Sequence, residues 1–169
     1  MVPSLAVTVA AVAVIEGAFK PTGDAGAFAP ACGTGHSIIL AAQAVPSAAR
    51  VPCVGVPPAG WSVYASADIL NGRATFWLDS SLAGGQALAV TLSATCDLTG
   101  ATQVRSDQPG TRRFDRPLSQ RPRFAELRFY TFPGGCVSYQ FHFTDGASPL
   151  LASQASSAID LMPRTRLVT

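Results

Sequence analysis

The chain has 169 residues, of which 48% are hydrophobic and 13% charged, and its formal net charge is +2. This length suits one domain with a short additional segment. The high apolar content excludes a wholly disordered chain, and the small net charge gives no support for a nucleic-acid-binding protein.

The first 19 residues form an apolar segment. Between Val2 and Phe19 the only charged residue is Glu16, and a helix of this length is near the lower limit for spanning about 30 Å of hydrocarbon. The basic start of a secretory signal is missing, because Lys20 is the first basic residue. We predict that residues 1–19 are a membrane anchor or signal-like segment and that residues 20–31 are a linker. The alternative is an apolar strand or helix of a soluble core.

The remaining chain predicts a helix, a series of strands and a second helix. Alanine and leucine favour the first helix, which Thr34 can cap and Pro46 stops. Asn71-Gly72 is a strong signal for a two-residue hairpin turn, and the following strands alternate apolar with polar residues. The predicted elements are a helix over 34–45, strands over 62–70, 73–79, 87–95, 125–132 and 136–144, and a helix over 148–162.

Residues 97–123 contain several glycines and prolines and few large apolar residues, which predicts mostly loop with a short strand around Thr102 to Arg105. Together these elements predict an α+β fold. It consists of an antiparallel sheet of about five strands in hairpin order, a short N-terminal helix, and a C-terminal helix that covers one face of the sheet. Residues 32–169 then form a single disulfide-bonded domain.

The four cysteines, Cys32, Cys53, Cys96 and Cys136, are too far apart in sequence for a CxxC pair, which excludes zinc-ribbon and thioredoxin-like motifs. Their even number predicts two disulfides, and we expect the sequence-adjacent pairing Cys32–Cys53 and Cys96–Cys136. Disulfides place the domain outside the cytoplasm. The alternative is four reduced thiols in the core of a cytosolic protein.

Candidate catalytic residues are few. The two histidines are His36 and His142, and Asp145 follows His142 closely, but there is no GxSxG motif to mark a nucleophilic serine. Cys32 and His36 lie four residues apart without a third metal ligand nearby. We therefore predict no catalytic set, no metal and no cofactor.

Arginines are concentrated between residues 105 and 128. Their planar guanidinium groups bind phosphate and carboxylate groups through paired hydrogen bonds, so this region is the predicted binding surface for an envelope protein or an anionic polymer. Nucleic acid is disfavoured as a partner of an exported domain. The alternative is a solvated loop in which arginines pair with Asp107 and Asp115. The predicted binding residues are Arg112, Arg113, Arg116, Arg121 and Arg123.

The chain resembles small membrane-anchored extracytoplasmic domains of uncharacterised actinobacterial proteins. The resemblance covers residues 32–163 and implies location and anchoring, not an activity. The motifs that carry it are Val51-Pro52-Cys53, Gly60-Trp61-Ser62, Phe76-Trp77-Leu78-Asp79, Pro109-Gly110-Thr111-Arg112-Arg113 and Phe132-Pro133-Gly134-Gly135-Cys136.

The favoured function is a non-catalytic extracytoplasmic envelope domain that binds a protein or an anionic partner and contacts the membrane through its N-terminal segment. One alternative is a carrier of a small apolar ligand or lipid. Its pocket would be lined by Trp61, Tyr64, Phe76 and Trp77, although such aromatics more commonly form the core. The other alternative is a hydrolase that uses His142 or His36.

Overall fold

The computed structural model describes residues 30–33, 35–70 and 72–167. Of these residues 48% are in strands and 15% in helices, so the chain is mostly β. The predicted α+β fold, with about five strands covered by a C-terminal helix, is therefore wrong. The apolar segment 1–19 and most of the linker 20–31 lie outside the described residues.

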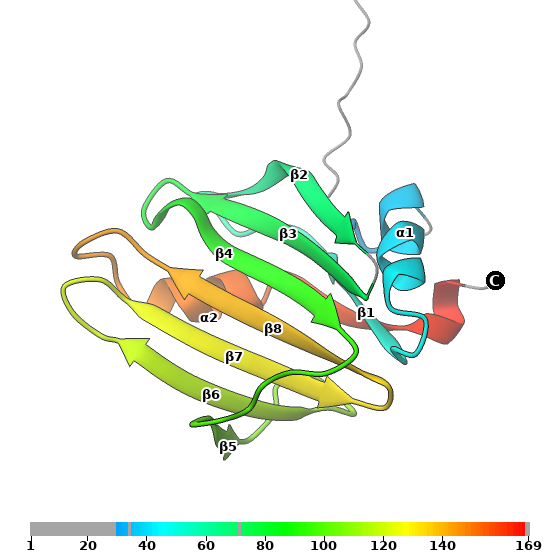
Figure 1. Cartoon of the computed structure of the whole chain (residues 1–169). Coiled ribbons are helices and arrows are strands. Elements are labelled where there is room, and N and C mark those ends of the chain that lie inside the picture. Colours follow the sequence, from blue (N-terminus) through cyan, green and yellow to red (C-terminus); the bar gives the residue numbers. More distant parts are fainter. Residues whose placement is uncertain (1–29, 34, 71, 168–169) are drawn as a thin grey trace, which may run out of the picture.

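Seven strands form one antiparallel sheet in the order β2-β3-β4-β8-β7-β6-β5 (Figure 1). β2, β3 and β4 follow one another as hairpins, and so do β5 to β8. The second series returns so that β8 pairs with β4, with Leu88 opposite Phe141. The strands are β2 (Trp61–Leu70), β3 (Arg73–Ser80), β4 (Gly84–Ser93), β5 (Thr102–Val104), β6 (Arg112–Ser119), β7 (Ala125–Phe132) and β8 (Gly135–His142).

The short-range predictions for the sheet are confirmed. β2 and β3 pair as far as Leu70 and Arg73, which is the hairpin that Asn71-Gly72 predicts. The predicted strands over 87–95, 125–132 and 136–144 correspond to β4, β7 and β8, and the short strand near Thr102 is β5. Hairpin order fails only between β4 and β5, because β5 lies at the far edge of the sheet.

Three strands were not predicted: β6, β9 and the strand β1 that pairs with β9. β6 lies in the segment expected to be a loop, and its charged side chains pair with those of β7. The predicted C-terminal helix stops early: α2 (Leu150–Ser156) has seven residues, and β9 (Ile159–Pro163) then pairs antiparallel with β1 (Arg50–Val54). A helical apolar stripe was expected from Leu151, Ala155, Ala158 and Ile159. In the structure the helix ends at Ser156, and Ile159 begins β9.

The core lies between the large sheet and a second layer, which consists of β1, β9, α2 and α1 (His36–Ala44) (Figure 1). We call the sheet face that packs on this layer the inner face. It contributes fully buried Leu78, Leu88 and Phe141, and the second layer contributes Ile38 and Ile159. Along a strand, successive side chains alternate between the inner face and the opposite face of the sheet, which we call the outer face.

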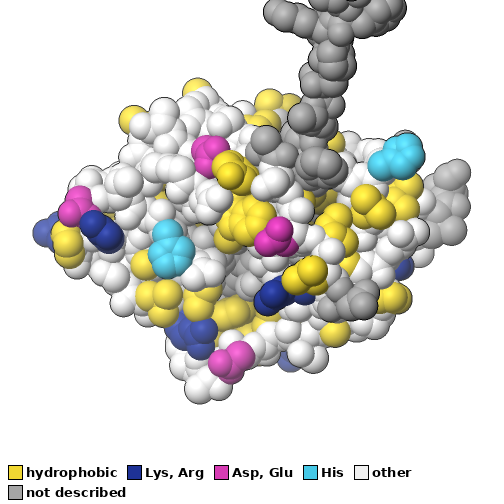
Figure 2. All heavy atoms as spheres, turned by 45° about the horizontal axis from the view of Figure 1, so that its top comes forward, with side chains coloured by type: hydrophobic (Ala, Val, Ile, Leu, Met, Phe, Trp, Pro, Cys, Tyr) yellow, Lys and Arg dark blue, Asp and Glu magenta, His cyan; other side chains and the backbone are white. Residues whose placement is uncertain are grey.

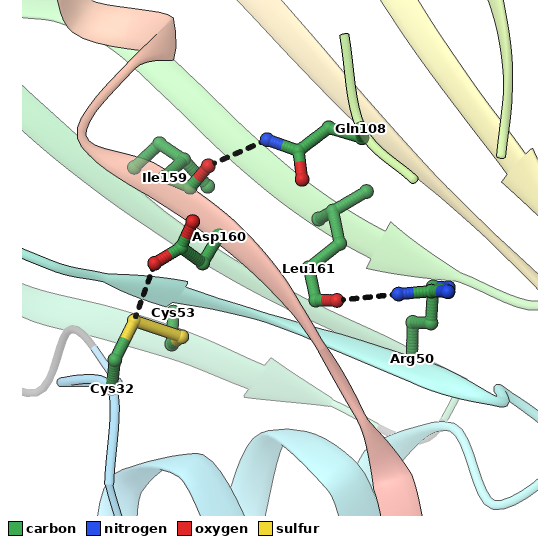
Figure 3. Close-up of a disulfide and its surroundings, with 7 residues drawn as sticks. All are labelled: Cys32, Arg50, Cys53, Gln108, Ile159, Asp160 and Leu161. Carbon is green, nitrogen blue, oxygen red and sulfur yellow. Dashed lines mark hydrogen bonds between the residues drawn. A yellow bond between two sulfur atoms is a disulfide. The ribbon is translucent and has the colours of Figure 1, made fainter. Parts of the chain in front are cut away.

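Both expected disulfides are present. Cys32–Cys53 attaches the end of the linker to β1, where Ala31 bridges to Val54 and Cys32 N donates to Val54 O at 3.0 Å. Asp160 of β9 lies beside this disulfide (Figure 3). The carbonyls of Ile159 and Leu161 also accept hydrogen bonds from Gln108 and Arg50, which satisfies polar groups of β9 (Figure 3). The distances are 2.9 Å in both cases.

The second disulfide, Cys96–Cys136, joins the β4–β5 connection to the outer face of β8. This connection, residues 94–101, crosses the outer face over β8, β7 and β6 (Figure 1). Among the described residues, nothing lies over the outer face of β2, β3 and β4 or of β8 beyond Cys136 (Figure 1).

Candidate functional site

The predicted arginine surface does not form one cluster. Successive residues of β6 point to opposite sides of the sheet, so Arg113 faces inward while Arg112 and Arg116 face outward. Arg121 and Arg123 lie beyond the end of β6, and Arg112 lies at its start. An eight-residue strand is about 25 Å long, which separates these two groups.

Arg113 belongs to an ion-pair network on the inner face. Its guanidinium makes two hydrogen bonds to Asp115, at 2.8 and 2.7 Å, and lies 3.5 Å from Asp107. Burial opposes the charged form, but the hydrogen bonds to Asp115 and the nearby carboxylate charges outweigh it, so the pKa of Arg113 is raised. The Arg113 side chain is therefore engaged within the protein, as in the alternative interpretation in which arginines pair with Asp107 and Asp115.

Arg128 extends the network beneath β7. Its side chain is 6% exposed and contacts Glu126 at 3.0 Å and Asp115 at 3.6 Å. It also donates to Ser156 Oγ of α2 at 2.7 Å. Next to it, burial and the charge of Asp107 raise the pKa of Tyr130, whose hydroxyl donates to Asp107 at 2.9 Å. These contacts join the sheet to the second layer.

The other predicted binding residues lie on the surface, in different settings. Arg116 donates to Thr99 O at 2.6 Å and lies over the ring of Phe129 at 5.4 Å, so it holds the crossing connection. Arg123 pairs with Asp145, with both side chains well exposed, so this pair contributes little stability. The side chains of Arg112 and Arg121 are exposed and make no hydrogen bond or ion pair with the described residues.

The uncovered half of the outer face carries an aromatic pair that the sequence analysis did not separate from the core. Tyr64 and Trp77 have ring centroids 6.2 Å apart and ring planes at 82°. Tyr64 is 36% exposed and Trp77 is half-buried. We call this surface the open face. It consists of Tyr64, Thr75, Trp77, Ala89, Thr91, Ser138, Gln140 and His142.

The rest of the open face is polar but almost uncharged. Gln140 Nε2 donates to His142 Nε2 at 2.7 Å, and the hydroxyls of Thr75 and Thr91 lie 2.9 Å apart. In Figure 2, hydrophobic side chains lie at the centre of the view and acidic side chains flank them. Such a surface offers ring faces together with neutral hydrogen-bonding groups.

The four aromatics of the proposed apolar pocket lie on two sides of the sheet. Trp61 and Phe76 are in the core, at 7% and 2% exposure, whereas Tyr64 and Trp77 are on the open face. The alternation of a strand already separates Phe76 from Trp77, so the outward position of Trp77 was available from the sequence. That of Tyr64 was available too, because it alternates with Trp61 and Val63, and the bulge between Val63 and Ala67 adds two residues to β2 and so keeps this alternation.

Catalytic geometry does not form around His142. His142, Arg123 and Asp145 line a surface depression of about 450 Å³, but Asp145 pairs with Arg123 and the His142 ring with Gln140. Cys32 is in a disulfide, so it is neither a nucleophile nor a metal ligand. Over the described ranges no group of three or more metal-binding side chains is present.

Two disulfides in a small β domain indicate an oxidising, extracytoplasmic environment. Among residues 30–33, 35–70 and 72–167, no helix is long and apolar enough to span a membrane. No family model, curated protein or solved structure matches this chain. The fold and its open face therefore define the class: an extracytoplasmic, disulfide-bonded β-sheet domain with an aromatic pair that the rest of the described chain leaves accessible.

Proposed function

We propose that this chain is a non-catalytic extracytoplasmic binding domain and that the open face is its ligand-binding surface. The observation that carries the proposal is the Tyr64–Trp77 pair on a part of the sheet that none of the other described elements covers. An antiparallel sheet keeps one face in water by placing polar residues there. Aromatic rings on such a face leave apolar surface exposed unless a partner covers them.

The arginines have a smaller place in this proposal. Arg113 and Arg116 are occupied by contacts within the fold, whereas Arg112, Arg121 and Arg123 remain accessible at the two ends of β6. An acidic envelope protein or an anionic polymer would meet them as separate charges. Anchoring through residues 1–19 is also part of the proposal and is supported by their apolar sequence.

Retention of envelope material by the immobilised protein tests this proposal. Ala89 lies between Trp77 and Gln140 in the middle of the open face, so Ala89→Arg places a long charged side chain there. Ser153→Arg adds the same charge on the exposed side of α2, in the second layer, and is the matched control.

We expect the wild type and Ser153→Arg to retain the same material from the native envelope fraction, and Ala89→Arg to lose it. Circular dichroism and urea unfolding show whether both variants remain folded. Equal retention by all three proteins would show that the open face is not the binding surface.

A further inference from the structure

The aromatic pair on the open face forms a corner. Its two ring planes are nearly perpendicular, at 82°, so Tyr64 and Trp77 form the two sides of a corner that is partly open to solvent. A pyranose sugar has an apolar face of C–H groups and a rim of hydroxyls. The C–H face packs on an aromatic ring, and the hydroxyls need hydrogen-bonding partners around it.

Such partners lie on the neighbouring strands. Because Gln140 Nε2 donates to His142 Nε2, the Gln140 carbonyl oxygen remains an acceptor and His142 Nδ1 carries a hydrogen that it can donate. Both side chains are exposed. Ser138 and Thr91 add hydroxyls that both donate and accept. A ligand rich in hydroxyl groups can use this mixture of donors and acceptors.

The spacing of the strands also suits a chain of sugar rings. Trp77, Ala89 and Gln140 occupy one row across β3, β4 and β8, because Trp77 pairs with Ala89 and Ala89 with Gln140. Neighbouring strands are about 4.8 Å apart, close to the width of a pyranose ring. The small side chain of Ala89 leaves space for a ring between the aromatic corner and Gln140.

The charges nearest the aromatic corner are carboxylates, which argues against an anionic ligand. Asp68 lies opposite Thr75 in the facing strand, and Asp79 lies two residues after Trp77 on the same side of β3. The one arginine on this side of β3, Arg73, is farther away, four residues before Trp77. Asp79 Oδ1 accepts the Gln86 N–H at 2.6 Å, which leaves its second oxygen for a ligand hydroxyl. Carboxylates repel an anionic polymer, whereas they accept hydrogen bonds from sugar hydroxyls.

We infer that the open face binds a neutral polysaccharide, with one pyranose ring packed in the Tyr64–Trp77 corner and the following rings hydrogen-bonded to Gln140 and His142. This inference rests on the proposed function of the open face and specifies its ligand. A protein partner is the alternative that the experiment must separate from it.

Tryptophan fluorescence provides the direct test. In the Trp61→Phe protein, Trp77 is the single tryptophan, and it lies on the open face. The probe is polysaccharide released from the native envelope by exhaustive protease digestion. We expect a saturable change in fluorescence that added salt does not weaken, since the contacts involve no ion pair.

Variants then assign the contacts. Gln140→Ala is expected to weaken binding about three- to tenfold, as loss of a neutral hydrogen bond does. Gln154→Ala removes the same side chain from the exposed side of α2 and is expected to leave binding unchanged. Trp77→Ala, assayed by retention in the wild-type background, is expected to abolish it. Absence of a fluorescence change, or a change that salt or Gln154→Ala removes, would overturn the inference.

Treatment of the retained envelope material separates this inference from the proposed function. If Ala89→Arg abolishes retention and the material is destroyed by periodate but resists protease, a polysaccharide ligand is supported. If the material is destroyed by protease and resists periodate, the open face still binds but its ligand is a protein, and the inference fails. If Ala89→Arg retains as much as the wild type, both fail.

Discussion

Replacing Arg128 with methionine tests the conclusion that the inner-face arginines hold the layers together. The guanidinium of Arg128 lies 3.0 Å from Glu126 Oε1 and 3.6 Å from Asp115 Oδ1, and it donates to Ser156 Oγ at 2.7 Å. Methionine keeps part of the aliphatic stem but removes the charge and all three contacts.

The expected loss of stability depends on how well the carboxylates of Asp115 and Glu126 are still paired after Arg128 is replaced. Removal of one partner of a buried ion pair destabilises a protein by about 3–5 kcal/mol, because the other charge stays buried. Asp115 keeps two hydrogen bonds from Arg113, and the side chain of Glu126 retains 13% exposure. We therefore expect the lower end, a decrease in the free energy of unfolding of about 3 kcal/mol.

Urea unfolding with both disulfides intact measures this loss as a lower midpoint at an unchanged slope. Arg112→Met is the matched control, because Arg112 is exposed and unpaired with the described residues, and its effect should stay within about 0.5 kcal/mol. Adding Glu126→Gln to Arg128→Met should restore about 1 kcal/mol, since no unpaired carboxylate remains. A loss for Arg128→Met no larger than that for Arg112→Met would refute the structural role of the network.

Two further measurements test other parts of the fold. Replacing Cys96 and Cys136 together with alanine should lower the free energy of unfolding by about 4 kcal/mol, because the disulfide closes a loop of 40 residues; an equally stable variant in urea unfolding would contradict this. Burial raises the pKa of Tyr139 and of Tyr130, so both stay protonated in the folded protein when unfolded tyrosines ionise above about pH 10. The free energy of unfolding should therefore fall there by about 1.4 kcal/mol per pH unit for each tyrosine, and Tyr130→Phe should remove half of that slope; a flat profile in urea unfolding at alkaline pH would exclude the effect.

The features that the sequence predicted correctly depend on neighbours in the chain. The Asn71-Gly72 turn fixes the β2–β3 hairpin locally, and the alternation along β8 makes Tyr139 and Phe141 buried whatever the rest of the fold does. The disulfide pairing was predicted from the order of the cysteines alone, and in the structure Cys96 meets Cys136 because β4 pairs with β8, with Ser93 opposite Cys136.

The failures arise where tertiary contacts decide. β6 lacks an alternation of apolar residues, because Arg113 and Asp115 on its inner side pair with each other and with Arg128 instead of packing as hydrophobic residues. The segment from Ile159 becomes a strand because β1 provides a partner edge, and β1 is more than 100 residues earlier in the chain. The arginines appear as one cluster in sequence, but a strand distributes neighbouring residues over two faces and two ends.

The length of the β4–β5 connection explains why half of the outer face stays open. From Ser93 to Thr102 the chain makes nine steps, about 30 Å when extended, and it must cross four inter-strand spacings of about 4.8 Å, about 19 Å in all. Little length remains for a detour towards Trp77, and two contacts hold the path over β8 and β6: the Cys96–Cys136 disulfide and the hydrogen bond from Arg116 to Thr99 O. The same connection that crosses over β7, where Phe129 is 4% exposed, is thus too short to reach the aromatic corner, which is why Tyr64 and Trp77 stay accessible among the described residues.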